Sequence, residues 1–384
     1  MRVLLLPASY SPVVGGLQTV VHGLARALDQ KGHQVCVATN KFPRRLQRRE
    51  QIDGINVRRL HFLSPRHNDI KRGRLDLFLA SLYCSPATRF ELARIVRTFS
   101  PDVVNVHYPD AQTAFVPALH KRFDFKLAVS LHGYDVERFS SDKISNERER
   151  KNFVALLGQA DVVTACSSYL LDQARKLEPS VVGKGRVVAN GIDRSRFADK
   201  LRHLHPRPYV LAAGRLTHAK GFDLLLTAFS QLNGRTGETD LIIAGEGELR
   251  ETLKRRVREL GLTQRVHFFG NATPDEIVRL LNGSLFMVVP SREEAFGVAA
   301  LEAMAAGKPV LATRVGGLPE FLVGSANKLV QPSIAGLQSG LTDWLERRDT
   351  LSSLGKENLA LAAKYTWEST AEEYLDAYAA GLDS

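Results

Sequence analysis

Residues 209–248, YVLAAGRLTHAKGFDLLLTAFSQLNGRTGETDLIIAGEGE, hold the pattern that decides the fold. A short apolar run ends in Gly214, a charged loop follows, then apolar residues recur three and four apart, and a second apolar run ends in Gly245. The middle spacing is that of one face of an amphipathic helix, and the flanking runs have the length of buried strands. A strand, a helix and a strand in this order form a βαβ unit of a parallel sheet.

The same alternation extends through both halves of the chain. In the first half, apolar runs begin at residues 2, 34, 102, 126, 161 and 186, and the second half adds runs at 265, 285 and 309. Two prolines and scattered charges interrupt the alternation at 201–209, and 384 residues exceed what one core usually supports. We therefore predict an α/β protein with two doubly wound, Rossmann-like domains facing a central cleft, namely 1–200 and 201–365, with a C-terminal helix in 366–384 that returns to the first domain.

Basic residues are concentrated in one short segment. The chain has a formal net charge of +11, and residues 41–74 contribute eleven Lys and Arg against three Asp and Glu, a net +8. No zinc-finger spacing or RNP-like aromatic motif accompanies them, so nucleic acid is not the expected partner. The next residues, LDLFLASLY at 75–83, are apolar. Two interpretations stay open: docking of this part on an anionic membrane surface, or a solvated basic face beside a segment that fills the core.

The cysteines and the first apolar run indicate the compartment. Cys36, Cys84 and Cys166 are far apart and form no C-x-x-C pair, so we expect small buried thiols and neither a disulfide framework nor a cysteine-rich metal site. The run from Val3 to Leu6 is too short for a signal peptide or a spanning helix. The expected location is the cytoplasm, peripheral on the inner face of the membrane if the basic segment docks there.

Ligands of doubly wound sheets bind beyond the carboxyl ends of the strands, so the chemistry is expected in the loops after the apolar runs. Gly15 and Gly16 open a helix after the first run, where the missing side chains let an anion approach the backbone N–H groups. A glycine pair alone is more often an ordinary loop. Neither this loop nor GEGELR at 245–250 has the G-x-G-x-x-G spacing of dinucleotide sites. His132 and Asp135 follow another run, where a histidine is more often structural than catalytic.

Two cations and a glycine lie in the loop after the run that ends in Gly214. They are Arg215, Lys220 and Gly221, of which the last opens the next helix. A guanidinium offers a planar fork to phosphate oxygens, an ammonium offers a point charge, and the helix end adds N–H donors. The loop therefore has the groups that a diphosphate needs. Taken alone, it fits a surface Arg and Lys beside a turn equally well.

A second charged segment is SREEAFGVAALEAMAAGKPVLAT, residues 291–313. Its apolar spacing predicts a helix that includes Val298 and a buried strand at 309–313, with Glu294 just before the helix and Glu302 within it. A helix N-terminus favours an anion, and if that anion is a ligand phosphate, both carboxylates can accept hydrogen bonds from sugar hydroxyls. By itself the segment favours a simpler interpretation, in which Glu294 caps the helix and Glu302 is a surface residue.

The order of these motifs along the chain resembles that of the retaining glycosyltransferases of family 4, which have the GT-B fold. The motifs are GGLQTVV (15–21), HGYD (132–135), NGID (190–193), GRLTHAKG (214–221), GEGE (245–248) and EAFGVAALE (294–302). Seven residues separate Glu294 from Glu302, as in the E-x7-E motif of that family. The resemblance covers nearly the whole chain and is strongest in the second half, which in this family binds the donor.

The resemblance implies a role for each motif residue. Arg215 and Lys220 would hold the donor diphosphate, Glu302 the ribose, and Glu294 the transferred sugar. The other expected donor contacts are His132 at the sugar, Gly15 and Gly16 near the phosphate, Asn190 by the cleft, Gly214 in the cationic loop, the backbone of Phe296, Gly297 and Val298 at sugar and phosphate, and Phe269, Gly270 and Asn271 against the base.

The implied reaction is retaining transfer of a sugar from a nucleoside-diphosphate-sugar to an acceptor hydroxyl, in the synthesis of a glycan, a glycolipid or a cell-envelope polysaccharide. No cofactor besides the donor and no metal ligand is expected, because the cations and a helix N-terminus stabilise the leaving diphosphate. A nucleotide-sugar epimerase of the same fold and a non-enzymatic nucleotide-sugar binder are the alternatives. The nucleotide (UDP, GDP or ADP), the sugar and the acceptor stay open.

Overall fold

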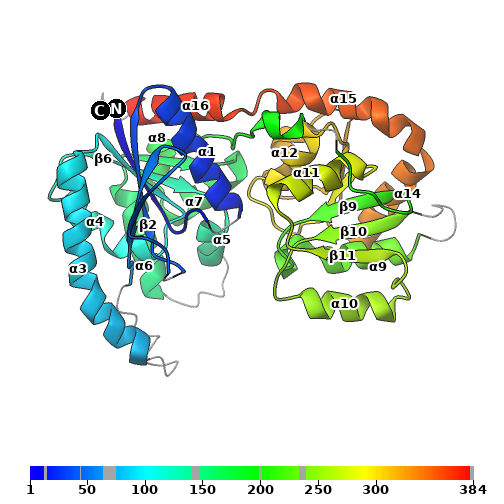
Figure 1. The fold of residues 1–384 in the computed structure, drawn as a ribbon, viewed down its shortest axis with the longest axis horizontal. Coiled ribbons are helices and arrows are strands. Elements are labelled where there is room, and N and C mark those ends of the chain that lie inside the picture. Colours follow the sequence, from blue (N-terminus) through cyan, green and yellow to red (C-terminus); the bar gives the residue numbers. More distant parts are fainter. Residues whose placement is uncertain are drawn as a thin grey trace. The chain divides into compact units, whose positions relative to one another are not determined.

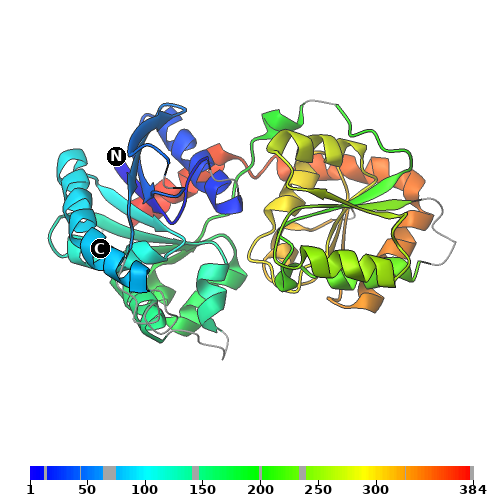
Figure 2. The same ribbon diagram turned by 60° about the horizontal axis from the view of Figure 1, so that its bottom comes forward.

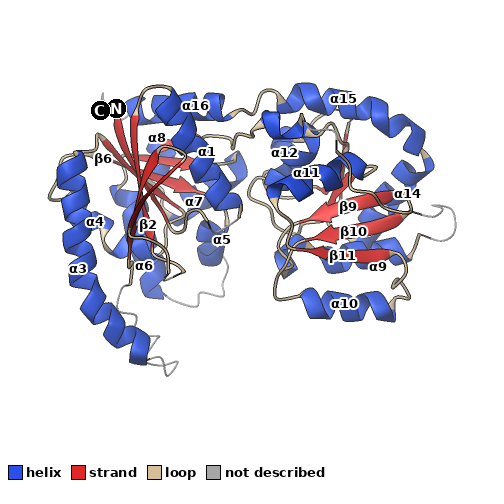
Figure 3. Cartoon of the chain, in the orientation of Figure 1, coloured by secondary structure: helices blue, strands red, loops and turns tan. Residues whose placement is uncertain are grey.

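The computed structural model describes residues 1–12, 15–43, 45–63, 75–140, 147–198, 201–232, 239–324 and 326–380, with the backbone alone at 75–78 and 140. The chain forms two compact units, Met1–Gly191 with Trp367–Ser384, and Ile192–Thr366. The predicted α/β class with two doubly wound parts is confirmed, since each unit is a mainly parallel sheet between helices (Figures 1 and 3). The division lies after Gly191 and not after residue 200. Ile192 already belongs to the second unit, where it pairs with Thr366 in an isolated bridge.

The sheet of the first unit has eight strands in the order β3-β4-β2-β1-β5-β6-β7-β8. All neighbours are parallel except β3 and β4. From β1 the chain first forms β2, β3 and β4 on one side of this strand and then β5 to β8 on the other side. The strand order therefore reverses between β1 and β5. The bounds are β1 Arg2–Pro7, β2 Gln34–Asn40, β3 Arg49–Ile52, β4 Ile55–Leu60, β5 Val103–His107, β6 Lys126–Leu131, β7 Val162–Ala165 and β8 Gly185–Val187.

The antiparallel pair β3–β4 lies within the basic segment and has no counterpart among the predicted strands. Asp53 and Gly54 turn the chain with positive φ angles of 47° and 84°. The Arg59 side chain on β4 is only 2% exposed, pairs with Glu50 on β3 and donates to the carbonyl of Ser11. The expectation of a uniformly solvated basic face is therefore wrong for Arg59, which supports the sheet. Of the other basic positions, Arg44 and those in 64–74 lie outside the described residues.

Helices cover the first sheet, and the C-terminal helix is one of them. The bounds are α1 Gly16–Gln30, α3 Leu75–Phe99, η1 Ala111–Ala114, α4 Val116–His120, α5 Tyr134–Ser140, α6 Glu147–Gln159, α7 Ser168–Leu177, α8 Val181–Lys184 and α16 Trp367–Ala380. Figure 1 shows α16, in red, beside α1, in blue.

Close packing and polar contacts explain why α16 lies in the first unit. A Cβ at Gly23 of α1 would lie 2.3 Å from the indole of Trp367, so the absence of a side chain admits this ring. Farther along, the Tyr378 hydroxyl accepts a 2.7 Å hydrogen bond from Asn105 in the buried centre of the sheet. Lys31 and Glu372 add an ion pair of 2.6 Å. The C-terminal helix thus completes the core of the N-terminal unit.

The sheet of the second unit is entirely parallel, in the order β11-β10-β9-β12-β13-β14. Its strands are β9 Tyr209–Ala213, β10 Asp240–Ala244, β11 Val266–Gly270, β12 Met287–Val289, β13 Val310–Thr313 and β14 Asn327–Val330. The first five match predicted runs, while β14 was not predicted. Because the chain runs β9, β10, β11 in one direction and β12, β13, β14 in the other, the strand order reverses between β9 and β12.

Helices also enclose this second sheet, as Figure 2 shows from below. The bounds are η2 Arg194–Phe197, η3 His218–Lys220, α9 Phe222–Ser230, α10 Arg250–Glu259, α11 Pro274–Gly283, α12 Val298–Ala305, α13 Leu318–Phe321, α14 Ile334–Glu346, η4 Arg348–Thr350 and α15 Leu351–Ala362. The predicted apolar face of α9 packs into a core with strands and with α14. The predicted capping box is also present, since Thr273 and Glu276 cap each other's backbone N–H groups at the start of α11.

Two further predictions concern single features. Cys36 and Cys166 are buried as expected, whereas Cys84 on α3 is only half-buried, and none of the three forms a disulfide. Among the described residues, no helix combines the length and the apolar character needed to cross a bilayer.

Candidate active site

The cationic loop of the second unit lies where the strand order reverses. The loop after β9 holds Arg215 and Lys220, and the loop after β12 runs from Pro290 to the start of α12. Since β9 and β12 are neighbours, both loops leave the same edge of the sheet side by side. Such a reversal point is where open α/β sheets bind ligands. The sheet topology therefore brings the two predicted donor segments together.

A glycine and an ion pair hold these two loops against each other. Gly221 has a left-handed φ of 64°, and a Cβ there would lie 2.0 Å from the carbonyl oxygen of Pro290. The backbone N–H of Arg292 donates to the carbonyl of Ala219 over 2.7 Å, and the Arg292 guanidinium makes two 2.7 Å hydrogen bonds to the Asp223 carboxylate. These bonds hold the pKa of Asp223 below its usual range. The sequence reasoning missed this clamp, although Arg292 lies only two residues before Glu294.

Lys220 and Glu294 form the central contact of the site. Lys220 Nζ lies 2.6 Å from Glu294 Oε2, and their side chains are 24% and 13% exposed. The Ser291 hydroxyl donates to the same oxygen over 3.2 Å. No described residue forms a hydrogen bond or an ion pair with the other oxygen, Oε1. An ammonium has three N–H donors, so Lys220 can keep this bond and still offer two to phosphate oxygens, while Oε1 can accept from a hydroxyl.

The backbone of Glu294 is itself held in place. Its carbonyl accepts a 3.0 Å hydrogen bond from the N–H of Gly317. Gly316 has a left-handed φ of 54°, and a Cβ there would lie 1.8 Å from the same carbonyl oxygen. The loop after β13 therefore touches Glu294 through backbone alone. This support was also missed, since neither glycine adjoins the predicted motifs in sequence.

Arg215 differs from Lys220 in having no side-chain partner among the described residues. Its side chain is exposed, and none of the described residues forms an ion pair or a side-chain hydrogen bond with it. The main chain around it is well fixed, because the N–H of Gly214 donates to Ala244 and the N–H of Leu216 donates to Glu246 over 2.9 Å. Arg215 is thus a free cation on a rigid loop, which suits a group that binds an anionic ligand.

The N-terminus of α12 lies next to Glu294. Gly297 is the N-cap, with φ 108°, and the first bond within the helix runs from the N–H of Leu301 to the carbonyl of Gly297. The N–H groups of Val298, Ala299 and Ala300 therefore have no acceptor within the helix. The Phe296 ring is buried and stacks on Phe321, with centroids 4.8 Å apart. Contacts of Phe296 and Gly297 with a ligand would therefore come from the backbone.

Glu302 lies one turn into α12 and is half-buried. Burial raises the pKa of its carboxyl, and the nearby positive charge of Arg196 opposes that rise. No described residue forms a hydrogen bond or an ion pair with the carboxylate. A half-buried carboxylate without a partner is costly unless a ligand supplies hydrogen-bond donors. The geometry therefore suits the predicted contact with ribose hydroxyls better than a merely solvated surface position.

The segment expected against the base ends β11. Gly270 is buried, and its carbonyl accepts a 2.7 Å hydrogen bond from the N–H of Gly245 at the end of β10. Phe269 is half-buried with its ring edge-on to His203, and Asn271 is exposed. These residues lie at the same edge of the sheet as the cationic loop, and β11 is two strands away from β9, which precedes that loop.

In the first unit, His132 follows β6 and is half-buried. Its Nε2 lies 3.1 Å from Nδ1 of His107 at the end of β5, and burial lowers the pKa of His132 to about 4. The Asp135 carboxylate does not reach the imidazole, because it accepts the backbone N–H groups of His132 and Gly133 at the start of α5. Burial raises the pKa of Asp135 to about 6. His132 is therefore a neutral imidazole positioned by His107, a neighbour that sequence reasoning missed.

The remaining predicted positions of the first unit lie at loops. Gly15 is the N-cap of α1, and Gly16 is exposed with no atom within 4 Å of where its Cβ would be. Among the described residues, Gly16 at the helix N-terminus is therefore accessible to a ligand. Asn190 is 6% exposed in the segment after β8, close to the boundary of the unit.

Family comparisons agree with this arrangement. The family described as "Glycosyltransferase Family 4" matches residues 14–196, and the family "Glycosyl transferases group 1" matches residues 193–359. The matches meet close to the boundary between the two units, and the fold is that of the GT-B glycosyltransferases. Each match covers slightly less than half of the chain, and together they show that the protein is a glycosyltransferase.

Individual relatives extend over the whole chain. An uncharacterized glycosyltransferase of Methanocaldococcus jannaschii is 29% identical over 100% of this chain and 99% of its own. Sucrose-phosphate synthase from Thermosynechococcus elongatus has the same fold, with a TM-score of 0.80, 21% identity and complete coverage of both chains. HepE of Anabaena, solved in complex with UDP-glucose, has a TM-score of 0.76 and 18% identity over 99% of this chain and 100% of its own.

Proposed function

We propose that this glycosyltransferase moves a sugar from a nucleoside-diphosphate-sugar to an acceptor hydroxyl with retention at the anomeric carbon. The observation that carries the proposal is the pairing of Lys220 with Glu294 beside the N-terminus of α12, with Arg215, unpaired among the described residues, on the same loop as Lys220. Positive charge and a hydrogen-bond acceptor thus lie together, as a diphosphate attached to a sugar requires. The UDP-glucose bound to HepE, a protein of the same fold, supports this class of donor.

In this mechanism the main barrier is the departure of the nucleoside diphosphate. Arg215, Lys220 and the free N–H groups of α12 stabilise its growing negative charge, while Glu294 Oε1 and Glu302 accept hydroxyls of sugar and ribose. These groups can replace a divalent cation in this role, so the proposed transfer is metal-independent. The departing phosphate takes the acceptor proton.

A panel of nucleotide-sugars, read by nucleotide release with and without candidate acceptors, tests the function. Acceptor-dependent release of nucleotide, insensitive to a chelator, is the expected result. The alternative, a nucleotide-sugar epimerase, needs no glycosyl acceptor. Acceptor-independent conversion of the donor would therefore replace the proposal, and activity that a chelator removes and Mg²⁺ restores would contradict metal independence.

We also propose that the first unit meets its acceptor at an anionic membrane surface. Helix α3 exposes apolar side chains and buries polar ones. Leu79, Leu82, Tyr83 and Phe90 are 56%, 50%, 86% and 70% exposed, whereas Ser81, Ser85 and Thr88 are buried. The exposed apolar residues share one face, at spacings of three, four and seven. Arg45, Arg48 and Arg49 in the preceding basic segment are exposed as well. Apolar residues with nearby cations suit reversible binding to anionic lipid.

Sedimentation with anionic and neutral vesicles tests this surface at low and high salt. We expect binding to anionic vesicles alone, reduced by salt and by Tyr83→Ser with Phe90→Ser. The matched control is Leu204→Ser in the second unit, because Leu204 is 90% exposed and lies outside α3. Equal binding to both kinds of vesicle, or none at low salt, would point to a soluble acceptor.

A further inference from the structure

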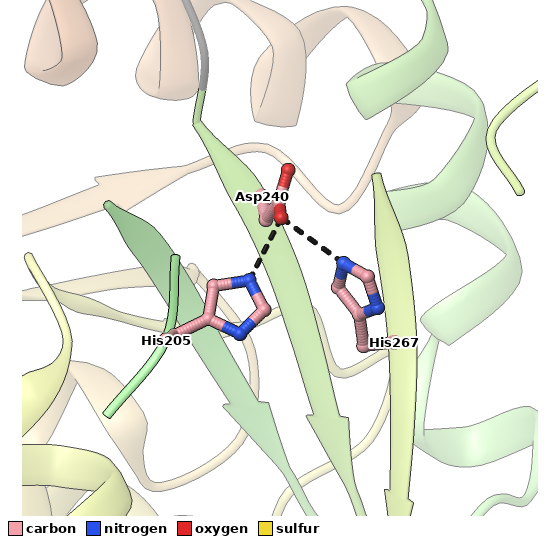
Figure 4. Close-up of side chains that lie close together, drawn as sticks. All are labelled: His205, Asp240 and His267. Carbon is pink, nitrogen blue, oxygen red and sulfur yellow. Dashed lines mark hydrogen bonds and ion pairs between the residues drawn. The ribbon is translucent and has the colours of Figure 1, made fainter. Parts of the chain in front are cut away.

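Three side chains of the second unit converge away from the proposed donor site. Nε2 of His205 and Nε2 of His267 lie 2.7 Å and 3.0 Å from the same carboxylate oxygen, Oδ2 of Asp240 (Figure 4). The carboxylate is 2% exposed, His205 is 13% exposed and His267 is 40% exposed. The ligand-capable atoms of all three lie within 4.8 Å of one another.

The cluster is built by the amino ends of neighbouring parallel strands. His205 precedes β9, Asp240 is the first residue of β10, and His267 is the second residue of β11. Arg215 and Gly270 lie at the carboxyl ends of the same strands. Each of these strands has five residues, which span about 16 Å at about 3.3 Å per residue, so the cluster is at the opposite edge of the sheet.

We propose that His205, Asp240 and His267 form a binding site for Zn²⁺. Two imidazole nitrogens and one carboxylate oxygen are a ligand set that Zn²⁺ accepts, with a fourth position for solvent. Tetrahedral ligands about 2.0–2.1 Å from the metal lie about 3.3 Å from one another. The two Nε2 atoms therefore need to move outward by only a few tenths of an ångström from Oδ2. Each neutral imidazole binds through the Nε2 lone pair and carries its proton on Nδ1.

Arg207 and Arg265 place positive charge near Asp240. Arg207 Nε lies 3.4 Å from Oδ1, the carboxylate oxygen that the histidines do not contact. Arg207 faces Oδ1 and so leaves Oδ2 available for the metal. Both cations also repel a dication. The site therefore suits a metal that imidazole binds strongly rather than Mg²⁺, which prefers several oxygen ligands. This proposal replaces the expectation that the chain has no metal ligands and is independent of the mechanism of transfer.

Titration with Co²⁺ and Zn²⁺ tests the proposal on tag-free full-length protein stripped with a chelator. Co²⁺ in a tetrahedral site with nitrogen and oxygen ligands absorbs in the visible range, and Zn²⁺ should displace it at one equivalent per chain. His267→Gln is the main variant, because glutamine can still donate a hydrogen bond to Asp240 and the side chain replaced is 40% exposed. We expect the variant to bind Zn²⁺ more than about 100-fold less tightly.

The control is His120→Gln in the first unit. His120 Nε2 lies 4.0 Å from Asp161 Oδ2. The substitution therefore removes a histidine from a His–Asp pair that has no second histidine among the described residues. This variant should bind both metals as the unaltered protein does. Circular dichroism checks folding, and His205→Gln takes the place of His267→Gln if the latter does not fold. Absence of metal binding by the unaltered protein, or equal binding by the histidine variants of the cluster, would overturn the proposal and leave a hydrogen-bonded structural cluster.

Discussion

Replacing Lys220 by alanine is the most direct test of the proposed active site. The substitution removes the ammonium that lies 2.6 Å from Glu294 Oε2 and that would also face the leaving diphosphate. It leaves Arg215, the N-terminus of α12 and the hydrogen bond from Ser291 to Glu294 in place. The variant therefore removes one charge-assisted contact from an otherwise intact site.

The expected magnitudes differ for catalysis and for folding. A preorganised donor to developing negative charge contributes about 2–4 kcal/mol to the transition state, so the rate should fall about 30- to 900-fold. A hydrogen bond to a charged group contributes about 1.5–3 kcal/mol when buried and less when partly exposed. Because Lys220 is 24% exposed, the free energy of unfolding should fall by only about 1 kcal/mol, a few degrees in Tm.

Nucleotide release with donor and acceptor measures the rate, and thermal unfolding measures stability. Lys254→Ala is the matched control, because Lys254 pairs with Glu251 over 3.2 Å on the exposed side of α10 in the same unit. The control should leave the rate unchanged. A rate for Lys220→Ala within a factor of about three of the unaltered enzyme would refute the assignment of Lys220 to the diphosphate.

Substitution of the two glutamates should have different effects. Glu302→Ala should weaken affinity for the free nucleoside diphosphate, whereas Glu294→Ala should lower kcat and leave that affinity almost intact. Equal losses of affinity would show that this division of roles is wrong. Gly221→Ala should abolish most activity and lower Tm, because its Cβ would lie 2.0 Å from the Pro290 carbonyl, and unchanged kinetics would contradict this loop geometry. Burial lowers the pKa of His132 to about 4, so the unfolded chain binds a proton that the folded chain does not between about pH 6.5 and 4. Stability should therefore fall as the pH falls through this window, and His132→Gln should reduce that slope in Tm measurements; parallel slopes for the two proteins would be inconsistent with a neutral buried imidazole.

The class of the fold and the locations of its loops could be predicted from residue spacing. Helix periodicity at α9 and α12 and the apolar runs of β9 and β10 depend on neighbours within four positions along the chain. The ends of those runs also locate the ligand loops, because parallel strands present their carboxyl ends at one edge. The identity of the motif residues then placed Arg215, Lys220 and Glu294 among the candidates before any contact was known.

Contacts between distant segments depend on strand order, which local spacing does not contain. Lys220 and Glu294 are 74 residues apart and meet only because β12 lies beside β9. The hairpin β3–β4 was missed because its strands are short and rich in charge, and Arg59 is tolerated inside only because Glu50 and the Ser11 carbonyl compensate its burial. The contact between His107 and His132 also depends on strand order, since β5 and β6 are neighbours in the sheet.

The sequence by itself therefore determined the two doubly wound sheets, the loops that carry chemistry and the residue types available there, because these follow from short-range periodicity. The tertiary structure decided which of those residues meet. It also decided the burial of Ser81 with the exposure of Tyr83 on α3, and the convergence of His205, His267 and Asp240. The physical reason is that burial and pairing are set by the packing of segments far apart in the chain, whereas each strand or helix is specified by its own few residues.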